Sequence, residues 1–306
     1  MEVQDLQSVT LKESQRSALG LFSEFARDIK LSHSIFALPF VGVALTRTGL
    51  PGVSWQSLSL IILCMILARS FAMGMNRYLD RNIDAGNVRT STRALPSGKV
   101  GPGGYLAITL ICGLLFMGAS FSLSPLAGWL SPVLLIVLTL YSLMKKLSWL
   151  THWYLGLCLG LAPVAAQIAL FGEVTMPVVL IGLAVAFWTA GFDLLYSLQD
   201  REFDQRNGLH SVPAKLGHRW AIWLSRLSFV CMSVCLSMVA VFSPVGWAWW
   251  AGVIVVTAVL ATEHWLVRDA MIDGVSSKIN LAFFNLNALV SVLFFIFAVL
   301  DLYVLV

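Results

Sequence analysis

The chain has 306 residues, of which 58% are apolar and 12% are charged, and its mean hydropathy is +0.83. Soluble domains contain about 45–50% apolar and about 25% charged residues, so this composition excludes a large soluble domain and indicates a polytopic helical protein of the lipid bilayer. The formal net charge is only +4, and basic residues interleaved with stacking aromatic residues are absent from the sequence, so no nucleic-acid partner is expected.

Apolar runs of about 20 residues are long enough to cross a hydrocarbon core of roughly 30 Å as helices. A segment of the chain, 1–30, precedes the first such run, and we expect 31–303 to form a single transmembrane domain. The fold class is therefore an all-α integral membrane protein. Nine transmembrane helices are predicted, at about 31–50, 55–75, 104–122, 127–144, 153–171, 176–197, 219–242, 246–266 and 280–303.

Basic residues gather on one side of these predicted helices. All lysines and arginines except Arg47 and Arg69 lie in the N-terminal segment, in the loops of that side or at the helix ends next to them. By the positive-inside rule the N-terminus is cytoplasmic, and nine crossings place the C-terminus outside. Two polar stretches, 77–103 and 198–218, then form cytoplasmic caps. A bacterial inner membrane is the simplest location, because the N-terminal segment resembles neither a secretory signal nor a transit peptide.

Five of the ten aspartates lie in or just before two short sequences at the cytoplasmic ends of the second and sixth predicted helices. The first, NRYLDRNID, covers 76–84, and the second, YSLQDREFD, covers 196–204. In each, a polar residue is followed by aspartates at i+4 and i+8, which lie on one face of an α-helix. Asp193 precedes Asp200 by seven residues and shares its face. The matching positions indicate two parallel four-helix halves followed by a ninth helix.

Grouped carboxylates repel one another unless a cation compensates them. Mg²⁺ prefers oxygen ligands and is commonly held by a few carboxylates together with substrate phosphates. Arginine and lysine residues on the same side of the membrane suit phosphate oxygens. The pattern therefore predicts a magnesium–diphosphate site that faces the cytoplasm.

The two acidic sequences also resemble a known family. Residues 76–98 and 196–204 are similar to the two Asp-rich signatures of the UbiA superfamily of intramembrane aromatic prenyltransferases. Within that family, 191–200 and 208–213 are most similar to 4-hydroxybenzoate polyprenyltransferases and to the related enzyme of futalosine-type menaquinone synthesis. The resemblance implies an enzyme that uses Mg²⁺ to transfer a polyprenyl group from polyprenyl diphosphate to a small aromatic carboxylic acid in ubiquinone or menaquinone biosynthesis.

The resemblance assigns roles to individual residues. The Mg²⁺ ligands are expected to be Asn76, Asp80, Asp84, Asp200 and Asp204. The diphosphate is expected to contact Arg89, Arg93, Lys145 and Tyr141. The catalytic residues are expected to be Asp193, Arg69 and Tyr196, with either Asp193 or the released diphosphate as the base that accepts the ring proton.

Two questions stay open on the sequence alone. The acceptor could be 4-hydroxybenzoate, 1,4-dihydroxy-6-naphthoate or another acceptor of the family. Arg69 could bind its carboxylate, bind the diphosphate, or pair internally with Asp193 or with backbone carbonyls. An ion-coupled transporter is a more distant alternative. Transporters place their ion ligands near the bilayer midplane, often in inverted repeats, whereas these acidic residues cluster at one face in parallel halves. The pattern therefore favours an enzyme.

Overall fold

The computed structural model describes residues 18–30, 38–49, 52–273 and 286–304, and within these ranges the secondary structure is helical without a strand. Several of the helices are long and apolar enough to cross a membrane, so the chain is a multi-pass membrane protein. These seven are α4 (Trp55–Ala85), α5 (Pro102–Leu123), α6 (Pro125–Leu147), α7 (Thr151–Phe171), α8 (Met176–Tyr196), α11 (His218–Phe242) and α12 (Trp247–Asp273).

The first and last predicted spans are described only in part. The helix α3 (Leu38–Thr46) occupies the middle of the first, and α14 (Asn287–Val304) covers most of the last. The rest of these two spans falls largely outside the described residues, so the count of nine crossings and the cytoplasmic N-terminus stay predictions. The second helix is ten residues longer than predicted, because α4 continues through the acidic sequence to Ala85.

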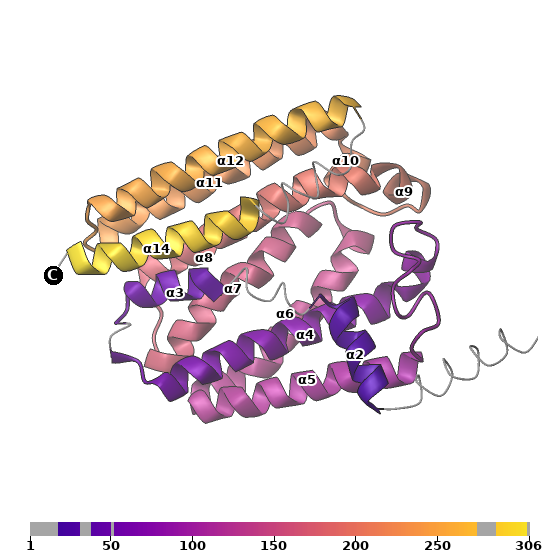
Figure 1. The fold of residues 1–306 in the computed structure, drawn as a ribbon, viewed down its shortest axis with the longest axis horizontal. Coiled ribbons are helices and arrows are strands. Elements are labelled where there is room, and N and C mark those ends of the chain that lie inside the picture. Colours follow the sequence, from indigo (N-terminus) through magenta and orange to yellow (C-terminus); the bar gives the residue numbers. More distant parts are fainter. Residues whose placement is uncertain (1–17, 31–37, 50–51, 274–285, 305–306) are drawn as a thin grey trace, which may run out of the picture.

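Successive long helices pack side by side, and α3 lies against α14, α7 and α8 (Figure 1). Buried apolar side chains of α3, α8, α11, α12 and α14 form the largest core cluster. Within it, the Phe40 ring lies 5.1 Å from that of Trp188 and 6.2 Å from that of Phe294, which in turn lies 5.0 Å from that of Trp249. This packing fixes α8, the helix whose C-terminal end carries the second acidic sequence.

Close contact between α7 and α8 depends on glycine. Gly156 and Gly160 are four residues apart on one face of α7, the spacing that allows helix backbones to approach closely in membranes. A Cβ atom at Gly156 would overlap the carbonyl oxygen of Ala186, and one at Gly160 would overlap that of Gly182. The two glycines therefore set the distance between α7 and α8.

A buried ion pair joins three helices at the end of the molecule opposite the acidic sequences. Arg47 follows α3, and its guanidinium lies 3.2 Å from the Asp301 carboxylate of α14, with side chains 2% and 0% exposed. Asp301 also accepts the backbone N–H groups of Gly246 and Trp249 at the start of α12, each at 2.9 Å. The Arg47 guanidinium lies 5.0 Å from the centre of the Trp249 ring.

We expect Arg47→Met to destabilise the protein by about 3–5 kcal/mol, because it leaves the buried Asp301 charge without its partner. The double variant Arg47→Met/Asp301→Asn should recover part of this loss, since the uncompensated charge is then removed. Melting temperatures in detergent measure both effects. A double variant that is less stable than Arg47→Met would contradict the ion-pair interpretation.

Candidate active site

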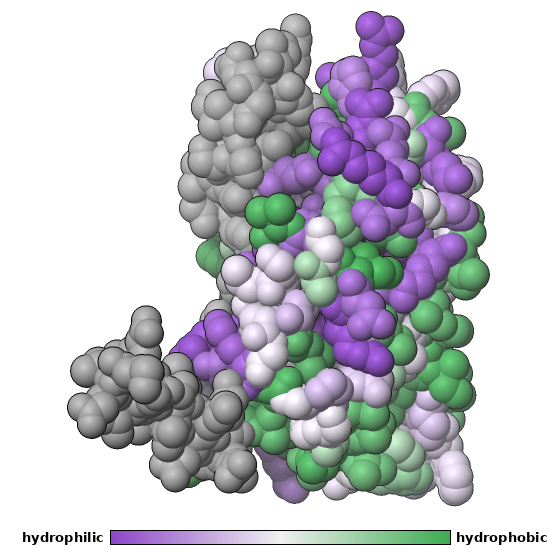
Figure 2. Space-filling model, turned by 90° about the vertical axis from the view of Figure 1, so that its right-hand side faces the viewer, coloured by the Kyte–Doolittle hydropathy of each residue, from purple (hydrophilic) through white to green (hydrophobic). Residues whose placement is uncertain are grey.

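Hydrophilic residues gather on the end of the molecule that carries the short helix α9 (Arg201–Arg206) and the loop between α4 and α5, with apolar residues beside them (Figures 1 and 2). A cavity of about 890 Å³ opens there. Every residue assigned to the site from the sequence lines this cavity except Asp204. The topology thus brings together side chains from α4, α6, α8 and the loops, as predicted.

The first acidic sequence forms the last turns of α4, where the i+4 spacing places Asn76, Asp80 and Asp84 along one face. The Asn76 amide donates to Asp80 Oδ2 at 3.0 Å and accepts from Arg77 at 3.2 Å. Asp80 Oδ1 lies 3.1 Å from the Lys146 ammonium of α6. The Asp80 carboxylate is therefore held by a residue of its own helix and by one of α6 while it faces the cavity.

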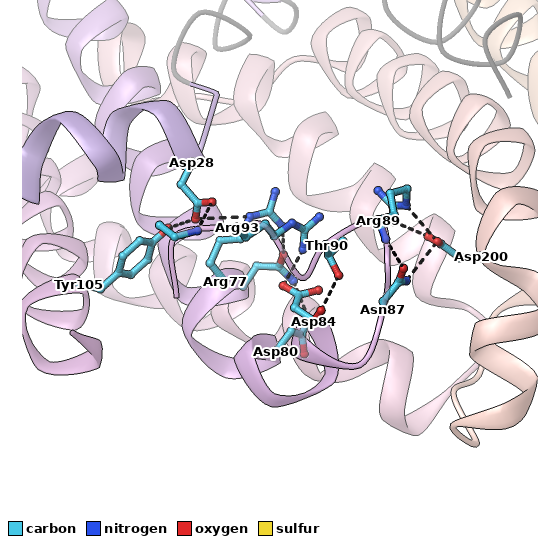
Figure 3. A network of polar contacts seen from close by, with 12 residues as sticks. Asp28, Arg77, Asp80, Asp84, Asn87, Arg89, Thr90, Arg93, Tyr105 and Asp200 are labelled. Atoms are coloured by element: carbon cyan, nitrogen blue, oxygen red, sulfur yellow. Dashed lines mark hydrogen bonds and ion pairs between the residues drawn. The ribbon is translucent and has the colours of Figure 1, made fainter. Parts of the chain in front are cut away.

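The loop 86–101 folds back over the end of α4. Arg93 donates to Asp84 Oδ2 at 2.6 Å, and the Thr90 hydroxyl donates to the Asp84 carbonyl at 3.0 Å. Figure 3 shows these contacts beside the Asp80 carboxylate. The expected cap of 77–103 is thus a shorter loop, because its first residues belong to α4 and its last two to α5.

The same loop reaches the second acidic sequence (Figure 3). Arg89 binds Asp200 through two hydrogen bonds, Nε to Oδ1 at 3.1 Å and an NH2 bond to Oδ2 at 2.6 Å. It also donates to the Tyr196 hydroxyl at 3.3 Å. Burial alone would lower the pKa of Arg89, but Asp200, together with Tyr196 and Asp84, outweighs burial and raises the pKa overall. Arg89 is therefore a permanent cation that ties the loop 86–101 to the second acidic sequence.

Asp204 departs from the predicted arrangement. The α-helical spacing is interrupted, because α8 ends at Tyr196 and a 3₁₀ turn, Ser197–Asp200, precedes α9. The change of helical type rotates Asp204 off the face it would share with Asp200 in a continuous α-helix. Its side chain is fully buried, and Oδ1 lies 2.8 Å from the Lys145 ammonium. In this structure Asp204 anchors Lys145 and does not line the cavity.

Basic side chains outnumber acidic ones around the cavity. Lys30, which follows the helix α2 (Ala18–Asp28), lines it together with Arg77, Arg89 and Arg93. Partial burial lowers the pKa of Lys30, and these three guanidinium groups lower it further by repulsion. This surplus of positive charge favours an anionic ligand with several charges.

Two site residues were not found from the sequence. Asp28 of α2 accepts hydrogen bonds from the Tyr105 hydroxyl at 2.7 Å and from the Ala94 N–H at 3.1 Å (Figure 3). It lies 3.9 Å from Arg77 and ties α2 to the cavity wall. His152 of α7 lies 2.7 Å from the Asp193 carboxylate. Neither residue belongs to a motif, and only their contacts in the fold reveal them.

The deeper part of the cavity holds the remaining predicted residues. Arg69 and Tyr141 line it, as does Asp193. Arg69 precedes Asn76 by seven residues on α4, about 10 Å farther into the membrane at 1.5 Å per residue. Asp193 pairs with His152, so the internal Arg69–Asp193 pair that the sequence left open is not observed. Arg69 Nε has no hydrogen-bond partner within the described part of the chain.

The oxygen atoms present fit a divalent cation that is shared with a substrate. The residues 18–30, 38–49, 52–273 and 286–304 contain no cluster of three His, Cys, Asp or Glu close enough to form a complete metal cage. Instead, Asp80 and Asp84 of α4 and Asp200 of the turn after α8 face one cavity, each beside its own basic partner. Mg²⁺ typically keeps several waters and takes its other ligands from substrate phosphates.

A profile of the UbiA prenyltransferase family matches residues 36–289. The chain belongs to this family. It is therefore an enzyme, a prenyltransferase, and the transporter alternative is wrong. Among named relatives, a 4-hydroxybenzoate octaprenyltransferase from Alcanivorax borkumensis is 28% identical over 243 residues, covering 78% of this chain and 83% of the relative. One from Cupriavidus pinatubonensis is 27% identical over 217 residues, covering 69% and 75%.

Solved structures confirm the fold of this family member. It resembles the apo structure of a UbiA homologue from Aeropyrum pernix K1 with a TM-score of 0.78 and 26% identity, over 89% of this chain and 98% of the homologue. A UbiA homologue from Archaeoglobus fulgidus bound to DMAPP and Mg²⁺ gives a TM-score of 0.66 at 18% identity, over 92% and 99%. The latter likeness concerns the fold alone.

Proposed function

We propose that this prenyltransferase moves a polyprenyl group from polyprenyl diphosphate to a ring carbon of 4-hydroxybenzoate in quinone biosynthesis, with Mg²⁺ as the cofactor. The observation that carries the proposal is one cavity with two chemically different parts. Its mouth combines aspartates with arginines, and its deeper part holds Arg69 and Asp193. The octaprenyltransferase relatives and the DMAPP- and Mg²⁺-bound homologue support it.

The mouth of the cavity binds the diphosphate. Asn76, Asp80, Asp84 and Asp200 would hold Mg²⁺, with Asp204 as a further ligand if Lys145 releases it. When bound, Mg²⁺ supplies positive charge that stabilises the leaving group. Arg89, Arg93 and Lys145 would donate to phosphate oxygens, and Tyr141, which lines the same cavity farther in, would reach the diphosphate from that side. As the allylic C–O bond breaks, its electron pair leaves with the diphosphate, whose growing charge these donors stabilise.

The deeper part orients the acceptor. Arg69 binds its carboxylate, and the electron-rich ring carbon next to the hydroxyl attacks the allylic carbon. The ring proton then leaves to Asp193 or to the released diphosphate, which restores aromaticity. Tyr196, whose hydroxyl accepts a hydrogen bond from Arg89, lines the same cavity and would orient the allylic carbon. Water must be excluded while the allylic cation exists. The loop 86–101 and α2 cover the mouth for this purpose.

The location follows from the charge distribution. The polar end carries α9, the loop 86–101 and most of the basic residues around the cavity. We infer that this end faces the cytoplasm of a bacterial inner membrane, where soluble aromatic acids are supplied and the prenyl tail extends into the bilayer.

The test is transfer of labelled geranyl group from geranyl diphosphate by purified protein in detergent, with Mg²⁺ or with EDTA. We expect Mg²⁺-dependent product with 4-hydroxybenzoate. If product forms only with 1,4-dihydroxy-6-naphthoate, the proposed reaction stands, but its acceptor is the naphthoate and not 4-hydroxybenzoate. Equal product in EDTA would contradict the role of the metal, and no product with either acid would contradict the proposed acceptor class.

A further inference from the structure

His152 is a buried polar group that the roles above do not use. It is the second residue of α7, and only 2% of its surface is exposed. Its Nδ1 lies 2.7 Å from Asp193 Oδ2, and its Nε2 lies 3.3 Å from the backbone nitrogen of Val212. Both ring nitrogens are therefore held by fixed partners, one on α8 and one at the start of the helix α10 (Val212–Lys215).

These two contacts determine the tautomer. The Val212 N–H can only donate, so Nε2 must accept and carries no proton. The proton of the neutral ring then resides on Nδ1 and is donated to Asp193 Oδ2. A doubly protonated ring would place an N–H group against the Val212 N–H. The hydrogen bond to His152 uses Oδ2, so Oδ1 is the oxygen that Asp193 offers to a bound acceptor.

The Val212 contact also links His152 to the loop that follows α9. The neighbouring His210 N–H donates to the Lys145 carbonyl at 2.7 Å, and Lys145 in turn pairs with Asp204. The loop is thus attached at two points, one on α6 and one on α7. Because Val212 holds Nε2, displacement of the loop frees the ring to rotate away from Asp193.

We propose that His152 is a positioning residue. It orients the Asp193 carboxylate in the deeper part of the cavity and makes that orientation depend on the placement of the loop at Val212. The inference rests on the proposed function, because the orientation of Asp193 affects the reaction only if the acceptor binds in the deeper part of the cavity. The consequence is that Asp193 is correctly placed only while the loop lies against α7.

Two substitutions separate orientation from packing. His152→Phe keeps the ring shape and removes both hydrogen bonds, whereas His152→Asn retains an amide N–H near the position of Nδ1. We expect His152→Phe to lower kcat with 4-hydroxybenzoate by about 10–100-fold, the value of a hydrogen bond to a charged group, with little change in the KM for geranyl diphosphate. His152→Asn should recover most of the loss. Equal losses in both variants, or no loss, would overturn the proposal.

A second measurement does not depend on activity. ¹⁵N NMR of histidine-labelled protein in detergent, assigned by comparison with His152→Asn, should show His152 with a protonated Nδ1 and an unprotonated Nε2. The opposite tautomer would overturn the proposal even if His152→Phe fails to fold. If the protein makes no product, the proposed function fails while the tautomer is still tested.

The matched control is His264→Phe on α12. His264 lines a separate groove of about 900 Å³ between α11 and α12, which holds none of the predicted site residues. We expect this variant to keep the kcat of the unmodified protein. A loss as large as that of His152→Phe would assign the effect to general helix packing and overturn the positioning role.

Discussion

Replacement of Asp80 or Asp200 by asparagine is expected to lower turnover by about 10³-fold or more at a fixed Mg²⁺ concentration, equivalent to about 4 kcal/mol of transition-state stabilisation. Each substitution removes one negative charge from the wall of the cavity and keeps the size of the side chain. The Mg²⁺ concentration for half-maximal activity should rise in both variants. Product formation from geranyl diphosphate across a Mg²⁺ titration measures both quantities.

The two positions make the test specific. Asp80 lies on α4 beside Lys146, and Asp200 lies on the 3₁₀ turn after α8 beside Arg89. Their local ion pairs are unrelated, so similar shifts in Mg²⁺ dependence would indicate ligands of one metal–diphosphate complex.

Glu202→Gln is the matched control. Glu202 lies between Asp200 and Asp204 in sequence, but its side chain is 83% exposed and pairs with Arg206 at the surface. This variant should keep the Mg²⁺ dependence of the unmodified protein. If Asp80→Asn and Asp200→Asn behave like Glu202→Gln, neither residue is a metal ligand.

The spacing of residues along the chain predicted how the side chains of the first acidic sequence are arranged on their helix. The i, i+4, i+8 pattern of Asn76, Asp80 and Asp84 needs only helical geometry, and α4 continues far enough to provide it. The long apolar helices were predicted for the same reason, because their lengths follow from the thickness of the bilayer. Features that depend on one element and its own backbone could therefore be predicted from the sequence.

Features that depend on a break in helical geometry, or on contacts between residues far apart in the chain, could not be predicted from the sequence. Nothing in the spacing of the second sequence predicts the 3₁₀ turn that moves Asp204 away from the cavity. His152 and Asp28 join the site only through the packing of α7 against α8 and of α2 against α5. An isolated histidine or aspartate in a sequence has many structural explanations, and the partner that gives it a role is chosen by the fold.

Arg69→Gln is expected to raise the KM for 4-hydroxybenzoate by about 10–100-fold, the value of charge-assisted hydrogen bonds to a carboxylate. Arg69 is placed for this contact because it lines the deeper part of the cavity and its Nε has no hydrogen-bond partner among the described residues. An arginine inside a membrane-spanning helix is costly and is retained where it meets a ligand or partner. Steady-state kinetics with each substrate varied in turn provide the measurement.

A change of acceptor shows whether Arg69 binds the carboxylate of the acceptor or the diphosphate of the prenyl donor. 4-Hydroxybenzamide has the shape of 4-hydroxybenzoate without its charge, so the unmodified enzyme should strongly prefer the acid, and Arg69→Gln should lose most of that preference. Arg69→Lys should lie between the two, since an ammonium keeps the charge without the two-pronged geometry of a guanidinium. If Arg69→Gln instead raises the KM for geranyl diphosphate and leaves the preference for the acid intact, Arg69 binds the diphosphate, and the carboxylate of the acceptor must be held by another residue of the cavity.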